Sequence, residues 1–174
     1  TGFDATTSRF PGGEIFMRFK LLIGALAAAA VLAGPVAAQT LRWASQGDPQ
    51  TMDPHSQNES MTNMMNGQVY EKLVTRDRKL NIVPSLATSW EQTGPLTWRF
   101  KLRPNVKFHD GSALSADDVV YSINRGKEPT SQVNVYANAV GTPVAIDPMT
   151  VEFRLDKVNP IFLQHMDALW ILSK

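Results

Sequence analysis

The pairs His109-Asp110 and Asp117-Asp118 contain the side chains in this sequence that best suit metal chemistry. One imidazole and three carboxylates close in sequence can ligate a divalent cation and activate a water molecule, if the chain folds them together. A metal-dependent hydrolase that uses His109, Asp110 and Asp118 is therefore one hypothesis. Such sites usually need further histidines, however, and the other two histidines stand in no spaced motif with His109.

The local sequence also gives these residues a structural role. Asp110-Gly111 is typical of a turn, here at the end of a short strand predicted over Val106–Phe108. Ser115 predicts the start of a helix with Asp117-Asp118 in its first turn, where the helix dipole favours negative charge. The helix is expected to end at Gly126. Its predicted buried residues are Val119, Val120, Tyr121 and Ile123. We favour this structural interpretation over a metal site.

A group of methionines is the second candidate for chemistry. Met61, Met64 and Met65, with Met52 nearby, are residues that soft metals or haem can use. Their spacing places them on one face of a helix predicted over Glu59–Leu73, and this pattern favours core packing. The sequence has no G-x-S-x-G or S-x-x-K motif and no glycine-rich phosphate loop. We therefore predict a protein that is not an enzyme and that has no cofactor and no metal.

Composition excludes several other classes of protein. Cysteine is absent, which excludes disulfides, thiolate metal sites and a lipid-modified cysteine anchor. Three of the 17 basic and two of the 16 acidic residues lie before residue 39, which leaves 14 of each after it. This balance provides no basic surface for nucleic acid and no polybasic patch for anionic lipid.

The N-terminal segment predicts secretion. Residues 17–38 begin at Met17 and contain two basic residues, an apolar run, a Gly-Pro break and small residues before Ala38. This is the pattern of a signal peptide, with a predicted cut after Ala38. A membrane anchor is the alternative, but the stretch is Ala-rich and has no positive stop-transfer cluster. Residues 1–16 are then a non-native leader, and we expect a periplasmic protein.

Strands and helices alternate along the rest of the chain. Gly94-Pro95 predicts a hairpin that joins Ser89–Glu91 to Thr97–Leu102, and Asp147-Pro148 predicts a second hairpin that continues over Thr150–Leu155. Two sets of apolar residues are each expected on one face: Trp98, Phe100 and Leu102, and then Val151, Phe153 and Leu155. A last apolar helix is predicted from Ile161 onward. The class is α/β or α+β.

The order of these pieces resembles one known family. The stretches "DPQTMDPHSQNESMTNMMNGQVYEKLVTRDRKLNIVPSLATSWE" and "TWRFKLRPNVKFHDGSALSADDVVYSINR" are similar to the N-terminal part of family 5 extracellular solute-binding proteins. These are the periplasmic dipeptide-, oligopeptide- and nickel-binding components of bacterial ABC importers. The resemblance runs from Leu41 to about Leu172. It agrees with the structural interpretation, because Phe100–Arg125 is a strand-turn-helix scaffold in this family.

The resemblance implies an α/β fold like that of type II periplasmic binding proteins, with two lobes, a hinge and an extra subdomain. Solute binds in the cleft, the lobes close on it, and the closed form meets the membrane permease. Family members are several times longer, so residues 39–174 are expected to be a truncated N-terminal part of the domain. We expect a monomeric receptor for peptides or a related solute, with nickel, glutathione, opines and sugars open as ligands.

Ligand residues carry over only for the loop after Asp53-Pro54-His55. In peptide-binding relatives this loop offers backbone and side-chain groups to the peptide. The resemblance therefore implies that Asn58, Glu59 and Ser60 line the cleft. These residues equally suit the N-cap of the helix that follows, a role that Ser60 could combine with ligand contact.

Overall fold

The computed structural model of the chain describes residues 44–45 and 47–174. The predicted leader (1–16) and signal peptide (17–38) lie outside these residues. Within the described part, no helix is both long and apolar enough to cross a bilayer.

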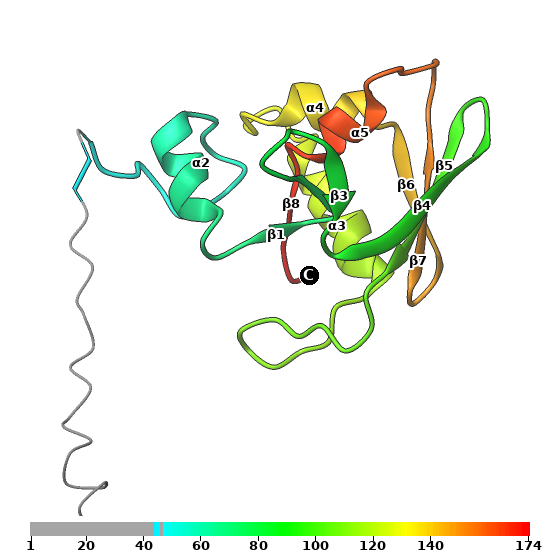
Figure 1. The fold of residues 1–174 in the computed structure, drawn as a ribbon, viewed down its shortest axis with the longest axis horizontal. Helices are drawn as coiled ribbons and strands as arrows, with labels where there is room; N and C mark the ends of the chain where they lie inside the picture. Colours follow the sequence, from blue (N-terminus) through cyan, green and yellow to red (C-terminus); the bar gives the residue numbers. More distant parts are fainter. Residues whose placement is uncertain (1–43, 46) are drawn as a thin grey trace, which may run out of the picture. The chain divides into compact units, whose positions relative to one another are not determined.

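The largest sheet has four antiparallel strands in the order β4-β5-β7-β6 (Figure 1). Both hairpins predicted from the sequence are confirmed. The first joins β4 (Ala87–Gly94) to β5 (Thr97–Leu102), and the second joins β6 (Thr142–Asp147) to β7 (Thr150–Arg154). The two hairpins are joined through their second strands, because β5 pairs with β7.

One face of this sheet forms the core, as the alternation predicts. Phe100 and Phe153 are fully buried and meet edge to face, with ring centroids 5.5 Å apart. Helix α5 (Phe162–Met166) adds Phe162, which stacks on Trp98 at 5.0 Å. Aromatic pairs in this arrangement contribute beyond the area that they bury. The sheet and α5 are therefore held together by one aromatic cluster.

Helix α3 (Ala116–Gly126) begins and ends where the sequence predicts. The carboxylate of Asp118 accepts hydrogen bonds from the backbone N–H and the hydroxyl of Ser115, at 2.8 and 2.7 Å. Val119 and Ile123 are fully buried, but the prediction for Tyr121 is wrong, because this side chain is 39% exposed. The strand predicted over Val106–Phe108 is also wrong, since this segment makes only one isolated bridge, between Lys107 and Ala113.

Helix α2 (Ser60–Asn66) is shorter than the helix predicted over Glu59–Leu73. It ends at Gly67, where a side chain would press against Trp170, with an added Cβ 3.3 Å from Cη2. The chain then turns into three short strands. These are β1 (Glu71–Lys72), β2 (Val74–Arg76) and β3 (Ile82–Pro84), of which β2 and β3 pair with each other.

The segment after Ile161 is not the single long helix predicted from its apolar residues. After α5 the chain becomes strand β8 (Trp170–Ile171), which pairs antiparallel with β1, so that Lys72 lies opposite Trp170 (Figure 1). Pairing with a distant strand has overridden the local pattern. Helix α4 (Asn134–Ala139), which the sequence analysis did not predict, packs against α5.

Candidate functional site

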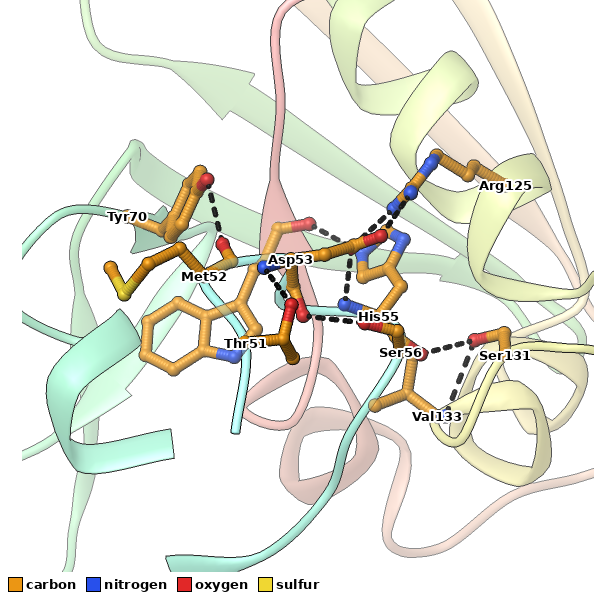
Figure 2. Close-up of polar contacts among 10 residues, drawn as sticks. Thr51, Met52, Asp53, His55, Ser56, Tyr70, Arg125, Ser131 and Val133 are labelled. Carbon is orange, nitrogen blue, oxygen red and sulfur yellow. Dashed lines mark hydrogen bonds and ion pairs between the residues drawn. The ribbon is translucent and has the colours of Figure 1, made fainter. Parts of the chain in front are cut away.

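The segment Thr51–Ser56 is fixed to α3 by a two-point ion pair. Arg125 donates from Nη1 to Oδ1 of Asp53 at 2.9 Å and from Nη2 to Oδ2 at 2.6 Å (Figure 2). The Asp53 carboxylate also accepts from the backbone N–H of His55 at 3.0 Å. Hydrogen bonds from Arg125 are the main reason that the pKa of Asp53 lies below its usual value. The carboxylate is therefore charged at neutral pH and orients the turn that contains it.

His55 joins this turn to two other parts of the chain. Its side chain is 2% exposed, and Nε2 lies 3.3 Å from the carbonyl oxygen of Trp170 in β8. Its own carbonyl oxygen accepts from the hydroxyl of Ser131 (Figure 2) and also from the backbone N–H of Gln132. Burial lowers the pKa of His55, so the imidazole is neutral at pH 7. Among the described residues, Nδ1 of this ring has no hydrogen-bond partner.

The chain leaves this anchored turn through the three residues predicted to bind ligand. Glu59 is the N-cap of α2, because its carboxylate accepts from the backbone N–H groups of Met61 and Thr62. These bonds lower the pKa of Glu59. Ser60 is the first helical residue and not the cap, so the cap role suggested for it belongs to Glu59. Asn58 accepts at Oδ1 from Nδ2 of Asn63, at 2.9 Å.

Asn58 and Ser60 line an open hollow of about 470 Å³. Its other walls come from α2, β1, α4, β8 and the α5–β8 connection. The lining residues include Asn63, Met64, Lys72, Tyr136, Asp167 and Trp170. Glu59 is not among them, since its carboxylate turns back to the first turn of α2. The structure thus brings two of the three predicted residues to one hollow.

Two charged residues, Lys72 and Asp167, line one side of the hollow. Asp167 lies between two cations, with Oδ1 3.4 Å from Nζ of Lys72 and Oδ2 2.8 Å from Nε of Arg76. The ammonium of Lys72 lies 4.2 Å from the centre of the Trp170 ring, within cation–π range. Sequence reasoning missed these residues, because the pairing of β1 with β8 that brings them together has no local signal.

The residues of the metal hypothesis do not form one site. Asp110 accepts from the backbone N–H and hydroxyl of Ser112, at 2.8 and 2.6 Å, as a turn residue does. Asp118 caps α3 and also accepts from the backbone N–H of Lys174 at 3.0 Å. His109 is exposed beside a separate hollow of about 300 Å³. Within residues 44–45 and 47–174, no three side chains of His, Cys, Asp or Glu gather as a potential metal site.

The methionines do not share a buried face either. Met64 and Met52 are each 45% exposed, and Met61 and Met65 are half-buried. The prediction that they pack together in the core is therefore wrong. The buried residues of α2 are the polar Thr62 and Asn66.

Comparison with known proteins identifies the family of this chain. The family model described as "Bacterial extracellular solute-binding proteins, family 5 Middle" matches residues 81–173, more than half of the chain. The chain is 30% identical to the glutathione-binding protein GsiB of Pectobacterium atrosepticum, over 84% of the chain and 29% of that protein. It is 32% identical to the dipeptide-binding protein of Escherichia coli strain K12, over 88% of the chain and 33% of that protein.

The fold agrees with these matches. The structure of the Escherichia coli murein tripeptide binding protein MppA superposes with a TM-score of 0.67 and 27% identity, over 74% of this chain and 30% of that one. The chain therefore spans about a third or less of the length of each of these relatives. The predicted fold class, part of a periplasmic-binding-protein fold, is confirmed. The chain belongs to family 5 of the bacterial extracellular solute-binding proteins.

Proposed function

We propose that the protein is the periplasmic substrate-binding component of an ABC importer, which captures a short peptide or a related solute and delivers it to a membrane permease. The observation that carries this proposal is the hollow beside Asn58 and Ser60, which follows directly from the anchored Asp53–His55 turn. Its walls combine amides, hydroxyls, an ammonium, a carboxylate and an indole. Such a mixture suits a small polar solute with some apolar surface.

The names of the relatives support the peptide class. GsiB is named for glutathione, and the other two proteins for dipeptides and a murein tripeptide, so all three names describe short peptides. In our proposal Asn58 and Ser60 contact the solute, and Glu59 supports them by capping α2. We also propose that the protein is secreted through the segment at 17–38, with a cut after Ala38. The receptor is proposed to be a monomer.

The first experiment is a thermal melt of the protein, produced with whatever sequence its gene carries after Lys174. The melt is repeated with pooled di- to pentapeptides, with reduced glutathione and with nickel. A ligand that binds only the folded form stabilises it by about 2.7 kcal/mol at a hundredfold excess over Kd, which raises Tm by a few degrees. A rise with peptides or glutathione supports the proposal. A rise in Tm with nickel alone would show that the solute is a metal and not a peptide. No rise with any of the three ligands would contradict the proposal.

The catalytic alternative is tested with one variant. His109→Ala removes an exposed side chain that does not line the hollow beside Asn58. A receptor keeps its solute affinity in this variant. A metal-dependent hydrolase would lose turnover, measured with a chromogenic ester and a phosphodiester in the presence of zinc or manganese.

A further inference from the structure

We infer that the hollow beside Asn58 receives an anionic group of the solute, a carboxylate, at Lys72. This inference rests on the proposed function as a solute receptor and names the chemistry of its ligand. Lys72, Arg76 and Asp167 lie in contact at the wall of the hollow and carry two positive charges and one negative charge. This cluster of three residues therefore carries a net charge of +1 before any solute arrives.

Asp167 leaves Lys72 free to bind a second anion. The stronger partner of Asp167 is Arg76, at 2.8 Å, whereas Nζ of Lys72 lies 3.4 Å from the other oxygen. An ammonium has three donors, and this long contact uses one of them. Lys72 lines the hollow, and Arg76 does not. The available positive charge therefore faces the space where the solute is proposed to bind.

The indole of Trp170 positions this ammonium. Nζ lies 4.2 Å from the ring centre, so the ring face attracts the charge and restricts the movement of a long, flexible side chain. Trp170 is 9% exposed and is held in β8, where it pairs with Lys72 across the ladder. A pre-oriented ammonium loses less entropy when it binds an anion than a free one does.

Three further polar residues of the hollow, Asn58, Ser60 and Tyr136, can donate to an acceptor on the solute. Oδ1 of Asn58 already accepts from Asn63, which leaves the two N–H donors of Asn58. Ser60 and Tyr136, which each carry a hydroxyl, line the same hollow. A carboxylate accepts from all of these groups, and hydrogen bonds between charged groups are the stronger kind. A cationic group in the same place would meet the like charge of Lys72.

The carboxylate could be the C-terminus of a peptide or an acidic side chain, and matched probes separate the two. Ala-Ala and its C-terminal amide differ only at the terminal carboxylate, and Ala-Glu and Ala-Gln differ only at the side chain. Isothermal titration of the whole protein with these four peptides gives the preference of the wild type without any variant. We expect removal of the recognised carboxylate to weaken binding about tenfold.

Lys72→Met then tests the residue. Methionine keeps the apolar contact with Trp170, and Arg76 still pairs with Asp167, so no carboxylate is left without a cation. We expect Lys72→Met to abolish the preference for the acid, and Lys72→Arg to retain it. Lys157→Met, which removes an exposed lysine that does not line the hollow, is the matched control and keeps the preference.

The outcomes separate the inference from the proposed function. Binding with no difference in either pair, or a preference that survives Lys72→Met, would overturn the carboxylate site and leave the receptor in place. If none of the four peptides binds to the wild type, both the dipeptide form of the proposed function and this inference fail.

Discussion

Arg125, in the last turn of α3, binds both carboxylate oxygens of Asp53, a residue 72 positions earlier in the chain. The two residues come from different motifs, "MDPHS" and "YSINR". Their pairing fixes the turn that precedes α2 and the loop of Asn58, which lines the hollow. The ion pair thus connects the strand-turn-helix scaffold to the proposed binding site.

A double-mutant cycle should detect this pairing. We expect Asp53→Asn and Arg125→Met to be coupled by about 1 kcal/mol in the free energy of unfolding, measured by urea titration of the two single variants and the double variant. The two-point geometry favours a large value, but Asp53 is 36% exposed, and solvent screens the charges.

The pair Arg103–Glu71 provides the matched control for this cycle. Its side chains are 45% and 52% exposed, and its shortest contact is 3.2 Å. We expect a coupling of no more than about 0.5 kcal/mol there. Equal couplings in the two cycles would show that the Asp53 pair has no special role.

Acidification below the ordinary imidazole pKa of 6.5 should reduce stability through His55. Because burial lowers the pKa of His55 in the folded state, the unfolded chain takes up a proton at a higher pH than the folded protein does. The contribution is complete above about pH 6.5 and is lost as pH falls toward the lowered pKa. Urea unfolding at several pH values between about 5 and 7.5 measures the slope of the free energy of unfolding against pH.

Two variants assign this slope to its residue. His55→Gln should flatten it, whereas His165→Gln should remove only the part due to His165, whose pKa burial also lowers. The partner of Arg125, Asp53, stays charged in this window, because its pKa lies below 3.8. An unchanged slope in His55→Gln would show that another group is responsible.

Gly141 should not tolerate a side chain. Its φ is +72°, in the left-handed region, and an added Cβ would meet the carbonyl oxygen of Arg154 and lie 2.8 Å from Cα of Leu155. We expect Gly141→Ala to lower the free energy of unfolding by about 3 kcal/mol, from backbone strain and overlap together. Gly47→Ala is the control, with nothing within 4 Å of its added Cβ and an expected change within about 0.5 kcal/mol. Similar losses at both positions would contradict this account.

The proposed solute contacts predict a different signature, loss of affinity with little change in Tm. Asn58→Ala and Ser60→Ala change exposed side chains, and we expect each to weaken binding of the best dipeptide about fivefold, the effect of one hydrogen bond. Asn124→Ala, on the exposed side of α3, should leave the titration unchanged. If the two loop variants bind as the wild type does, Asn58 and Ser60 are not solute contacts.

Local sequence patterns predicted the elements whose signals lie within a few residues. Ser115 with Asp118 set the start of α3, and Asp147-Pro148 set the turn of the second hairpin. Local patterns gave wrong predictions where pairing with distant segments determines the structure. The methionine periodicity predicted a helix through residue 73, but β1 pairs with β8 and Gly67 lies against Trp170.

The hollow beside Asn58 shows the same limit of local sequence patterns. The sequence resemblance directed attention to Asn58 and Ser60, which do line it. Lys72, Asp167 and Trp170 could not be assigned to the same place, because the segment after Ile161 was expected to be helical throughout. Residues from β1, β8 and the end of α5 that meet in this way have no periodicity of their own to detect.

The pairing of β1 with β8 also sets an order of events during folding. Glu71 lies opposite Ile171, and His55 contacts the carbonyl of Trp170, so both contacts close loops of about a hundred residues. Contacts between residues this far apart in sequence form late, after the local hairpins. The entropy cost of closing such a loop must first be offset by structure that has already formed. The local hairpins form first, and the loop of Asn58 gains its opposite wall only when β8 pairs with β1. The hollow beside Asn58 is therefore among the last parts of the described chain to assemble.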